Sequence, residues 1–210
     1  MTQFGASNTC MTRISHHISR KAATTLLHSA RTAAATGRPF TVAVSITTFL
    51  LGIPETEISE KFRKMRRLRF VRWSTYIPKG SNGMRNSRPA DTWQIEAPNG
   101  FHHIHWMLHI RPESRAEFEK KLERWVKAMA GMKPTDPLPP GSLAVYDLHN
   151  PEGKKLYMAK GIDPFYARLF RIKPVDCGTV YGVRGGTARS LGPSVWKPLK
   201  KAYQASKVSL

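Results

Sequence analysis

The chain has 210 residues, 40% of them hydrophobic, so it can bury a core without disulfides or a structural metal. Thirty-four Lys and Arg against fourteen Asp and Glu give a formal net charge of +20, which predicts a polyanionic partner, either a nucleic acid or an anionic membrane surface. Two cysteines without a CxxC pair exclude a zinc finger and a disulfide framework, and they favour a reducing, cytoplasmic compartment.

The N-terminal region is basic and has no acidic residue before Glu55. This composition is found in organelle transit peptides, but a solvated arm is the simpler interpretation. We predict such an arm over residues 1–38, partly helical within 18–35 or disordered. The most apolar run, residues 40–53, is too short to cross a bilayer, so no membrane segment is expected.

Residues 41–49 alternate apolar and small polar side chains, the pattern of a half-buried strand. A helix is predicted after Pro54, with Thr56 as its N-cap and an apolar stripe through Phe62. Its other face carries cations without acidic partners, which indicates contact with phosphate groups. The residues expected to bind phosphates there are Lys64, Arg66, Arg67, Arg69 and Arg72, and Trp73 is expected to stack on an unpaired base.

A hairpin is predicted next, beyond a loop over 77–90 that is another candidate phosphate-binding segment. Its strands are 91–97 and 101–110, and the Asn99-Gly100 pair between them is a strong hairpin signal. A helix with a capping box follows, with Ser114 as its N-cap. The later elements are a strand over 142–148, a helix over 153–161 and a strand over 178–183.

This order of elements predicts an α+β fold with a central antiparallel sheet and helices packed on its face or faces. The expected folded domain covers residues 39–185, and a basic tail covers 186–210.

Three histidines at alternating positions, His103, His105 and His109, share one face of the strand over 101–110. If Asn99-Gly100 forms a two-residue loop, Glu96 lies directly opposite His103, and Gln94 lies opposite His105. Two imidazoles and one oxygen donor then converge on one patch. The expected ligands are His103, His105 and Glu96, with Gln94 as the alternative oxygen donor, and such a set suits Mn²⁺ or Mg²⁺ with substrate phosphates, or Zn²⁺ or Ni²⁺.

The His103-Ile104-His105 run resembles the histidine–hydrophobic–histidine signature of HUH endonucleases. A second motif of that superfamily, Tyr-x-x-Lys on a helix, is similar to Tyr157-Met158-Ala159-Lys160, which lies 52 residues after His105. The order and spacing look like those of rolling-circle replication initiators. The resemblance implies a ferredoxin-like or RRM-like domain and a metal-dependent nick in which Tyr157 becomes joined to the 5′ phosphate, with Lys160 supplying a cation.

Further implications concern partners. The DNA would be the single-stranded or hairpin origin of a plasmid or phage. The chain has no GxxxxGK[ST] motif, so no nucleotide cofactor is expected and a separate helicase would unwind the DNA. Three alternatives remain open: a single-tyrosine transposase of the same superfamily, a phosphodiesterase that uses water, and a non-catalytic nucleic-acid-binding protein with structural histidines.

Overall fold

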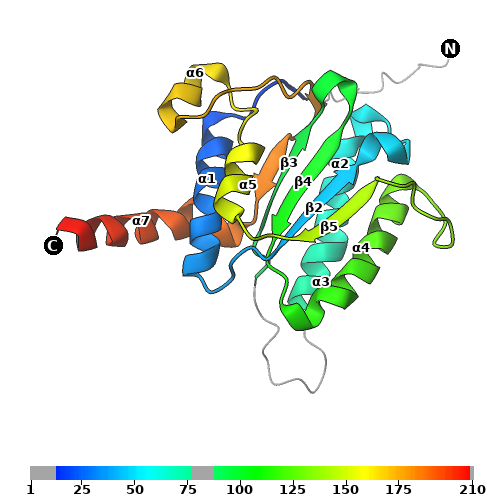
Figure 1. Cartoon of the computed structure of the whole chain (residues 1–210), viewed down its shortest axis with the longest axis horizontal. Coiled ribbons are helices and arrows are strands. Elements are labelled where there is room, and N and C mark those ends of the chain that lie inside the picture. The colour runs from blue at the N-terminus through cyan, green and yellow to red at the C-terminus, as the bar shows by residue number, and fades with distance from the viewer. Residues whose placement is uncertain (1–12, 77–87, 209–210) are drawn as a thin grey trace, which may run out of the picture.

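The computed structural model describes residues 13–76 and 88–208, so most of the predicted loop over 77–90 lies outside the described residues. A five-stranded antiparallel sheet occupies the centre, with strand order β5-β2-β4-β3-β7 (Figure 1). The α+β class predicted from the sequence is confirmed. The strands are β2 (Val42–Thr47), β3 (Asp91–Glu96), β4 (His103–Leu108), β5 (Leu143–Asp147) and β7 (Gly185–Thr187).

Helices cover both faces of this sheet (Figure 1). One face packs against α2 (Glu55–Met65), α3 (Arg72–Thr75) and α4 (Arg115–Ala130). The other face packs against α1 (Arg20–Ala35) and α5 (Pro151–Met158). Two buried clusters therefore share β4. Its side chains alternate between them, so that Trp106 points toward α2 and α4 while Met107 points toward α1 and α5.

The basic helix predicted after Pro54 is longer than a single regular helix. It begins at Glu55, with Pro54 rather than Thr56 as the N-cap, and continues through a π-helical stretch (Arg66–Val71) into α3. Its buried stripe packs Phe62 and Phe70 edge-on against Trp106, with ring centroids 5.4 and 4.8 Å away.

The capping box predicted for α4 is wrong. Ser114 is the N-cap, but its backbone is helical and its side chain caps no amide. Ser114 is the last residue of a 3-10 turn over Pro112–Ser114, so the backbone is already helical where α4 begins. Glu117, the other half of the predicted box, instead accepts a hydrogen bond of 3.1 Å from Trp73 Nε1.

The two ends of the described chain pack onto the rest of the fold, and α1 (Arg20–Ala35) lies within the segment 18–35 that was expected to be helical. Helix α1 buries an alanine-rich face against the sheet, and β7 crosses the boundary predicted at residue 185. A two-stranded sheet joins β1 (Ile14–Ser15) to β6 (Val180–Tyr181), so the strand predicted over 178–183 lies outside the central sheet. Helix α7 (Pro193–Val208) extends away from the sheet and stacks Trp196 on His28 of α1 at 4.1 Å (Figure 1).

The remaining short elements connect these layers. They are α6 (Pro164–Ala167) and the 3-10 turns Thr48–Leu51, Pro98–Gly100, Arg168–Phe170 and Arg189–Leu191. Within the described ranges, no helix is both long enough and apolar enough to cross a membrane.

Candidate active site

The carboxylate of Glu96 is the centre of the candidate site. Its Oε1 atom lies 2.8 Å from His105 Nε2 and accepts a hydrogen bond of 3.2 Å from the Tyr157 hydroxyl. Its Oε2 atom lies 2.9 Å from Lys160 Nζ and 3.8 Å from the sulfur of Cys177. We call Glu96, His105, Tyr157 and Lys160 the Glu96 cluster. Four side chains that the sequence analysis selected thus meet in one place.

The hairpin sets the positions of Glu96 and His105. Asn99 and Gly100 both adopt left-handed backbone conformations, with φ of 54° and 81°, and the resulting turn pairs Glu96 with His103 and Gln94 with His105, as predicted. Glu96 nevertheless reaches diagonally to His105. Diagonal neighbours on adjacent strands lie within reach of long side chains.

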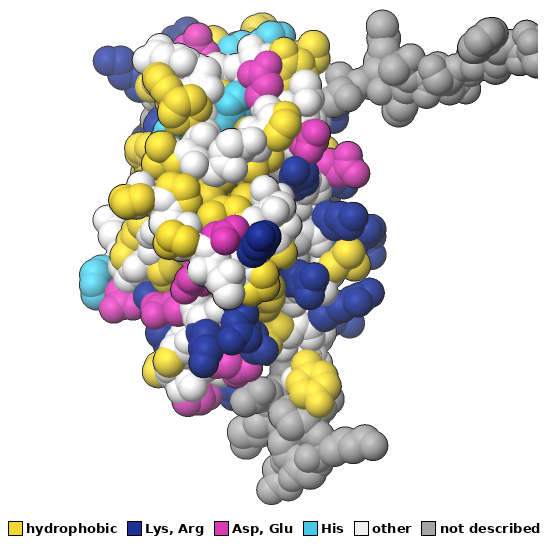
Figure 2. All heavy atoms as spheres, turned by 90° about the vertical axis from the view of Figure 1, so that its right-hand side faces the viewer, with side chains coloured by type: hydrophobic (Ala, Val, Ile, Leu, Met, Phe, Trp, Pro, Cys, Tyr) yellow, Lys and Arg dark blue, Asp and Glu magenta, His cyan; other side chains and the backbone are white. Residues whose placement is uncertain are grey.

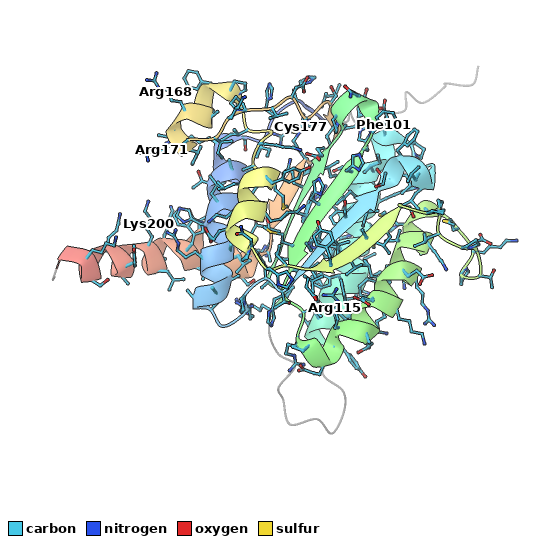
Figure 3. The ribbon with its side chains drawn as sticks, in the orientation of Figure 1. Phe101, Arg115, Arg168, Arg171, Cys177 and Lys200 are labelled. Carbon is cyan, nitrogen blue, oxygen red and sulfur yellow. The ribbon has the colours of Figure 1, made fainter. Side chains whose placement is uncertain are left out.

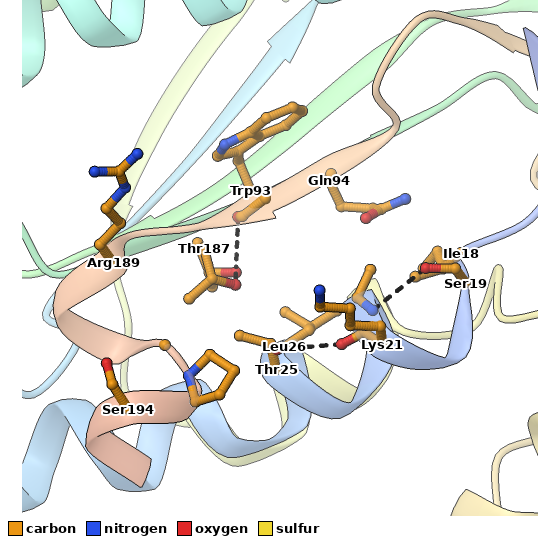
Figure 4. A pocket seen from close by; sticks show the side chains of 16 residues that line it. Ile18, Ser19, Lys21, Thr25, Leu26, Trp93, Gln94, Thr187, Arg189 and Ser194 are labelled. Atoms are coloured by element: carbon orange, nitrogen blue, oxygen red, sulfur yellow. Dashed lines mark hydrogen bonds between the residues drawn. The ribbon is translucent and has the colours of Figure 1, made fainter. Parts of the chain in front are cut away.

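Gln94 lies apart from the cluster. It lines a cavity of about 460 Å³ between the first turns of α1 and the β3–β7 edge, where Lys21 and Thr25 face it (Figure 4). Its amide donates to the carbonyl of Ile95 at 3.3 Å. The structure therefore brings Glu96, rather than Gln94, into contact with His105.

Helix α5 positions the other two members of the cluster. Asn150 caps its start by accepting a hydrogen bond from the Gly153 amide at 2.8 Å, and Met158 anchors its end in the core between α1 and the sheet. Tyr157 lies on the exposed side and packs its ring edge-on against His105, with centroids 5.2 Å apart. Lys160 lies just beyond the helix end, not on the predicted helical face, and its Nζ atom is 3.9 Å from the centre of the Tyr157 ring.

Burial and two cationic partners act against each other on Glu96. Only 5% of its surface is exposed, and burial alone would raise the pKa of its carboxyl group. Hydrogen bonds and charge from His105 and Lys160 outweigh burial and lower this pKa to about 2. In turn, burial lowers the pKa of Lys160, but contacts with Tyr157 and Glu96 prevail and raise it. The pair is therefore ionised at neutral pH.

His103 is half-buried beside the cluster. Its Nδ1 atom lies 3.4 Å from Thr47 Oγ1 on β2. Burial and the nearby His105 lower the pKa of His103, so its imidazole is neutral at pH 7, the form that binds metals. The Nδ1 atom of His105 is buried and has no hydrogen-bond partner among the described residues.

Chemically, His103, His105 and Glu96 suit a divalent cation, because they offer two imidazoles and an ionised carboxylate on one sheet face. Two of the donor atoms, His105 Nε2 and Glu96 Oε1, are already neighbours. In the arrangement described for residues 13–76 and 88–208, however, no three His, Cys, Asp or Glu side chains are grouped as a metal site.

Other residues near the cluster gave little or no signal in the sequence. Cys177 is a lone cysteine, and burial together with Glu96 raises the pKa of its thiol to about 11. Lys154 Nζ lies 4.7 Å from the centre of the Tyr157 ring, on the helix that carries the tyrosine. Tyr166, the next tyrosine after Tyr157 in the chain, packs against Phe165 of α6 instead. Cys177 lies at the same end of the sheet as Phe101 (Figure 3).

Two of the predicted DNA-binding residues are engaged inside the protein. Arg66 forms a paired contact with buried Asp91, with Nη2 2.7 Å from Oδ1. Trp73 packs against Phe118 and Trp125, so its ring contributes to the core between α3 and α4 rather than lying free for stacking. The other predicted contacts are exposed and make no ion pair with any described residue; these are Lys64, Arg67, Arg69 and Arg72.

No protein-family model and no curated protein sequence matches this chain. Its function must therefore be inferred from the site itself.

An acid-stability difference is expected at Glu96 in metal-free protein. In the unfolded chain its carboxyl protonates near pH 4.5, whereas in the folded protein it stays ionised down to about pH 2. The unfolded state therefore binds the proton first, and the stabilisation present above pH 4.5 is lost as the pH falls toward 2. The total loss is roughly 3 kcal/mol. Urea unfolding in EDTA from neutral to acidic pH should show the stability gap between wild type and Glu96→Gln closing over that window.

Glu113→Gln is the matched control for that measurement. Glu113 is an exposed carboxylate that pairs with Arg111 at 3.1 Å on the surface. The difference in unfolding free energy between Glu113→Gln and wild type should stay small at every pH. A gap for Glu96→Gln that is equally large at neutral and at acidic pH would show that the Glu96 pKa is not lowered.

Proposed function

We propose that the chain is a metal-dependent endonuclease that nicks and rejoins DNA through Tyr157 and so initiates rolling-circle replication of a plasmid or phage. One observation carries the proposal. Tyr157 and Glu96, which are 61 residues apart, form a hydrogen bond within a cluster that also contains His105 and Lys160. A tyrosine, a lysine, histidines and a carboxylate in contact are the groups that phosphodiester transfer through a tyrosine needs.

In the proposed reaction, the Tyr157 oxygen attacks phosphorus. The bond from that oxygen to phosphorus forms, and the bond from phosphorus to the 3′ oxygen breaks. Glu96 orients the hydroxyl but is a poor base, since the pKa of its carboxyl is about 2. The phenolic proton therefore passes to water, which reaches Tyr157 because 43% of this residue is exposed. The departing 3′ oxygen takes a proton from water.

Lys160 would stabilise the transition state. Its ammonium lies over the Tyr157 ring, where a phosphate attacked by the tyrosine would meet a positive charge. His103, His105 and Glu96 would hold the divalent cation, Mn²⁺ or Mg²⁺, which when bound draws charge from the non-bridging phosphate oxygens. Attack of the free 3′ hydroxyl on the phosphotyrosine reverses the reaction, so rejoining consumes no nucleotide.

The surface charge supports a nucleic acid as the substrate. The net charge is +20, and Lys and Arg side chains crowd one border of the face shown in Figure 2. We propose origin DNA, single-stranded or folded as a hairpin, with unwinding left to a separate helicase.

A gel experiment tests this function. Purified protein is mixed with a pool of single-stranded oligonucleotides of varied sequence that carry a label at the 3′ end, with Mn²⁺ or with EDTA. A tyrosine that takes the 5′ phosphate retains the 3′ fragment, so we expect a labelled protein band that resists SDS and requires Mn²⁺. Tight, salt-sensitive binding without such a band would contradict the proposal and favour a non-catalytic binding protein. Cleavage without the band would make water the nucleophile.

A further inference from the structure

A basic groove runs along the sheet face opposite to the Glu96 cluster. It has a volume of about 860 Å³ and lies between α2 and the segment that joins β6 to β7. Ser59 holds the two walls together, because its hydroxyl donates to the Val183 carbonyl at 2.8 Å and accepts from the Val183 amide at 2.9 Å. Gly182 permits this close approach: its φ is +98°, and a Cβ there would lie 2.8 Å from Ser59 Oγ. The shape of the groove is thus fixed by specific hydrogen bonds between its two sides.

Three cations in this groove are free to bind a ligand. Arg63, Lys64 and Arg67 line it, are exposed, and make no ion pair with any residue in the described parts of the chain. Neighbouring cations on the same helix differ, since Arg66 is paired with Asp91 and Lys61 with Glu57. Glu60 is the one acidic side chain among the described lining residues. The free charge in the groove is therefore positive, which suits a polyanion.

The groove offers no exposed aromatic ring among its described lining residues. Trp93 is only 4% exposed and packs edge-on against Phe62, and Tyr181 is half-buried in β6. Single-stranded nucleic acids are commonly held by bases stacked on aromatic side chains, whereas a cationic surface without such rings contacts only the backbone.

Exposed rings gather elsewhere, where the hairpin turns. Phe101 and Phe49 are 46% and 55% exposed, and their rings contact each other edge-on at 4.8 Å. Phe101 lies two residues before His103, the first residue of the strand that carries the candidate ligands. Unpaired bases would therefore find stacking partners near the Glu96 cluster, and none in the groove.

We propose that the groove binds the sugar–phosphate backbone of a double-stranded stretch of DNA, while the opposite sheet face receives the unpaired strand. The second half of this statement rests on the proposed nicking function, but the first half does not. A protein with this division would grip paired DNA beside the segment that it cuts.

The slope of affinity against salt concentration tests the groove. The variant Arg63→Ala/Lys64→Ala/Arg67→Ala is compared with Lys120→Ala/Arg124→Ala/Lys133→Ala, which removes the same charge from exposed positions outside the groove. Binding to a duplex and to a single strand of equal length is measured by fluorescence anisotropy at several salt concentrations. For the duplex, we expect the groove variant to lower the slope of log K against log salt by about 2 to 3, because each lost phosphate contact removes about 0.9. The control variant should change this slope by less than about 1.

Three results would overturn the groove proposal. The first is an equal loss of slope in both variants, and the second is a loss of slope in the groove variant with the single strand alone. The third is a groove variant that loses binding to phosphatidylserine vesicles while its binding to the duplex stays intact. Thermal unfolding confirms that both variants fold. The nicking proposal fails separately: if wild type forms no covalent adduct yet the duplex slopes differ as expected, the groove stands and the nuclease does not.

Discussion

Replacing Tyr157 by Phe is expected to abolish the Mn²⁺-dependent covalent band completely while leaving DNA affinity within about fivefold, since the net worth of one hydrogen bond is about 1 kcal/mol. The hydroxyl is the proposed nucleophile, and no other atom of the side chain takes part in the bond to phosphorus. The ring of the Phe variant keeps its contact with His105, so the site should retain its shape. The measurement is the adduct gel together with anisotropy on the same single strand.

Tyr166→Phe is the matched control for this variant. Tyr166 is a half-buried tyrosine of α6, nine residues beyond Tyr157 in the sequence, and its ring faces Phe165 and Arg20 rather than Glu96. It should form the adduct at the wild-type rate. An adduct that persists in Tyr157→Phe and disappears in Tyr166→Phe would reassign the nucleophile, and cleavage without an adduct in Tyr157→Phe would point to water.

The variant Asp91→Asn is expected to lower the free energy of unfolding by about 3 to 5 kcal/mol, because it leaves the Arg66 side chain, which is only 19% exposed, without its counter-charge. Asp91 is completely buried. Its Oδ1 atom accepts from Arg66 Nη2 at 2.7 Å, and its Oδ2 atom accepts from Arg66 Nε and, at 2.9 Å, from Trp106 Nε1. The Asp91 carboxylate thus connects the π-helical stretch after α2, the start of β3 and Trp106 in the middle of β4.

Urea unfolding at pH 7 measures the effect. Asp91→Asn combined with Arg66→Met should recover part of the lost stability, since the unpaired cation is then removed together with its partner. Glu113→Gln, which breaks an exposed ion pair, should cost at most about 1 kcal/mol. If Asp91→Asn behaves like this surface control, the buried pair contributes nothing to stability.

The hairpin and its site were accessible from sequence because local rules determine them. Strand periodicity places His103 and His105 on one face, and the Asn99-Gly100 turn fixes the register that sets Glu96 opposite His103. Helical spacing placed Tyr157 near Lys160, although the lysine reaches the cluster from the turn after α5.

Long-range partners were not accessible in this way. Arg66 lies in a run of cations that has no acidic neighbour in sequence, and only the folded sheet brings Asp91 to it. Trp73 likewise lies in a basic segment, yet the π-helical stretch before it brings its ring onto Phe118. The burial of α1 depends on small alanines that allow close approach to the sheet, and alanine is also common in solvated helices.

The guanidinium of Arg184 relates the candidate site to the order in which the chain is made. This buried group donates to the carbonyls of Ser15, Cys177 and Gly178. It therefore connects the start of the described chain to the segment of Cys177 and Gly178, which lies beside Glu96. A ribosome releases Glu96, His105 and Tyr157 well before it releases Arg184. A nascent chain that already carries these three residues therefore still lacks the Arg184 guanidinium, which holds the segment of Cys177 and Gly178 beside them. We therefore expect the Glu96 cluster to reach its final arrangement only after residue 184 has left the ribosome and folded into place.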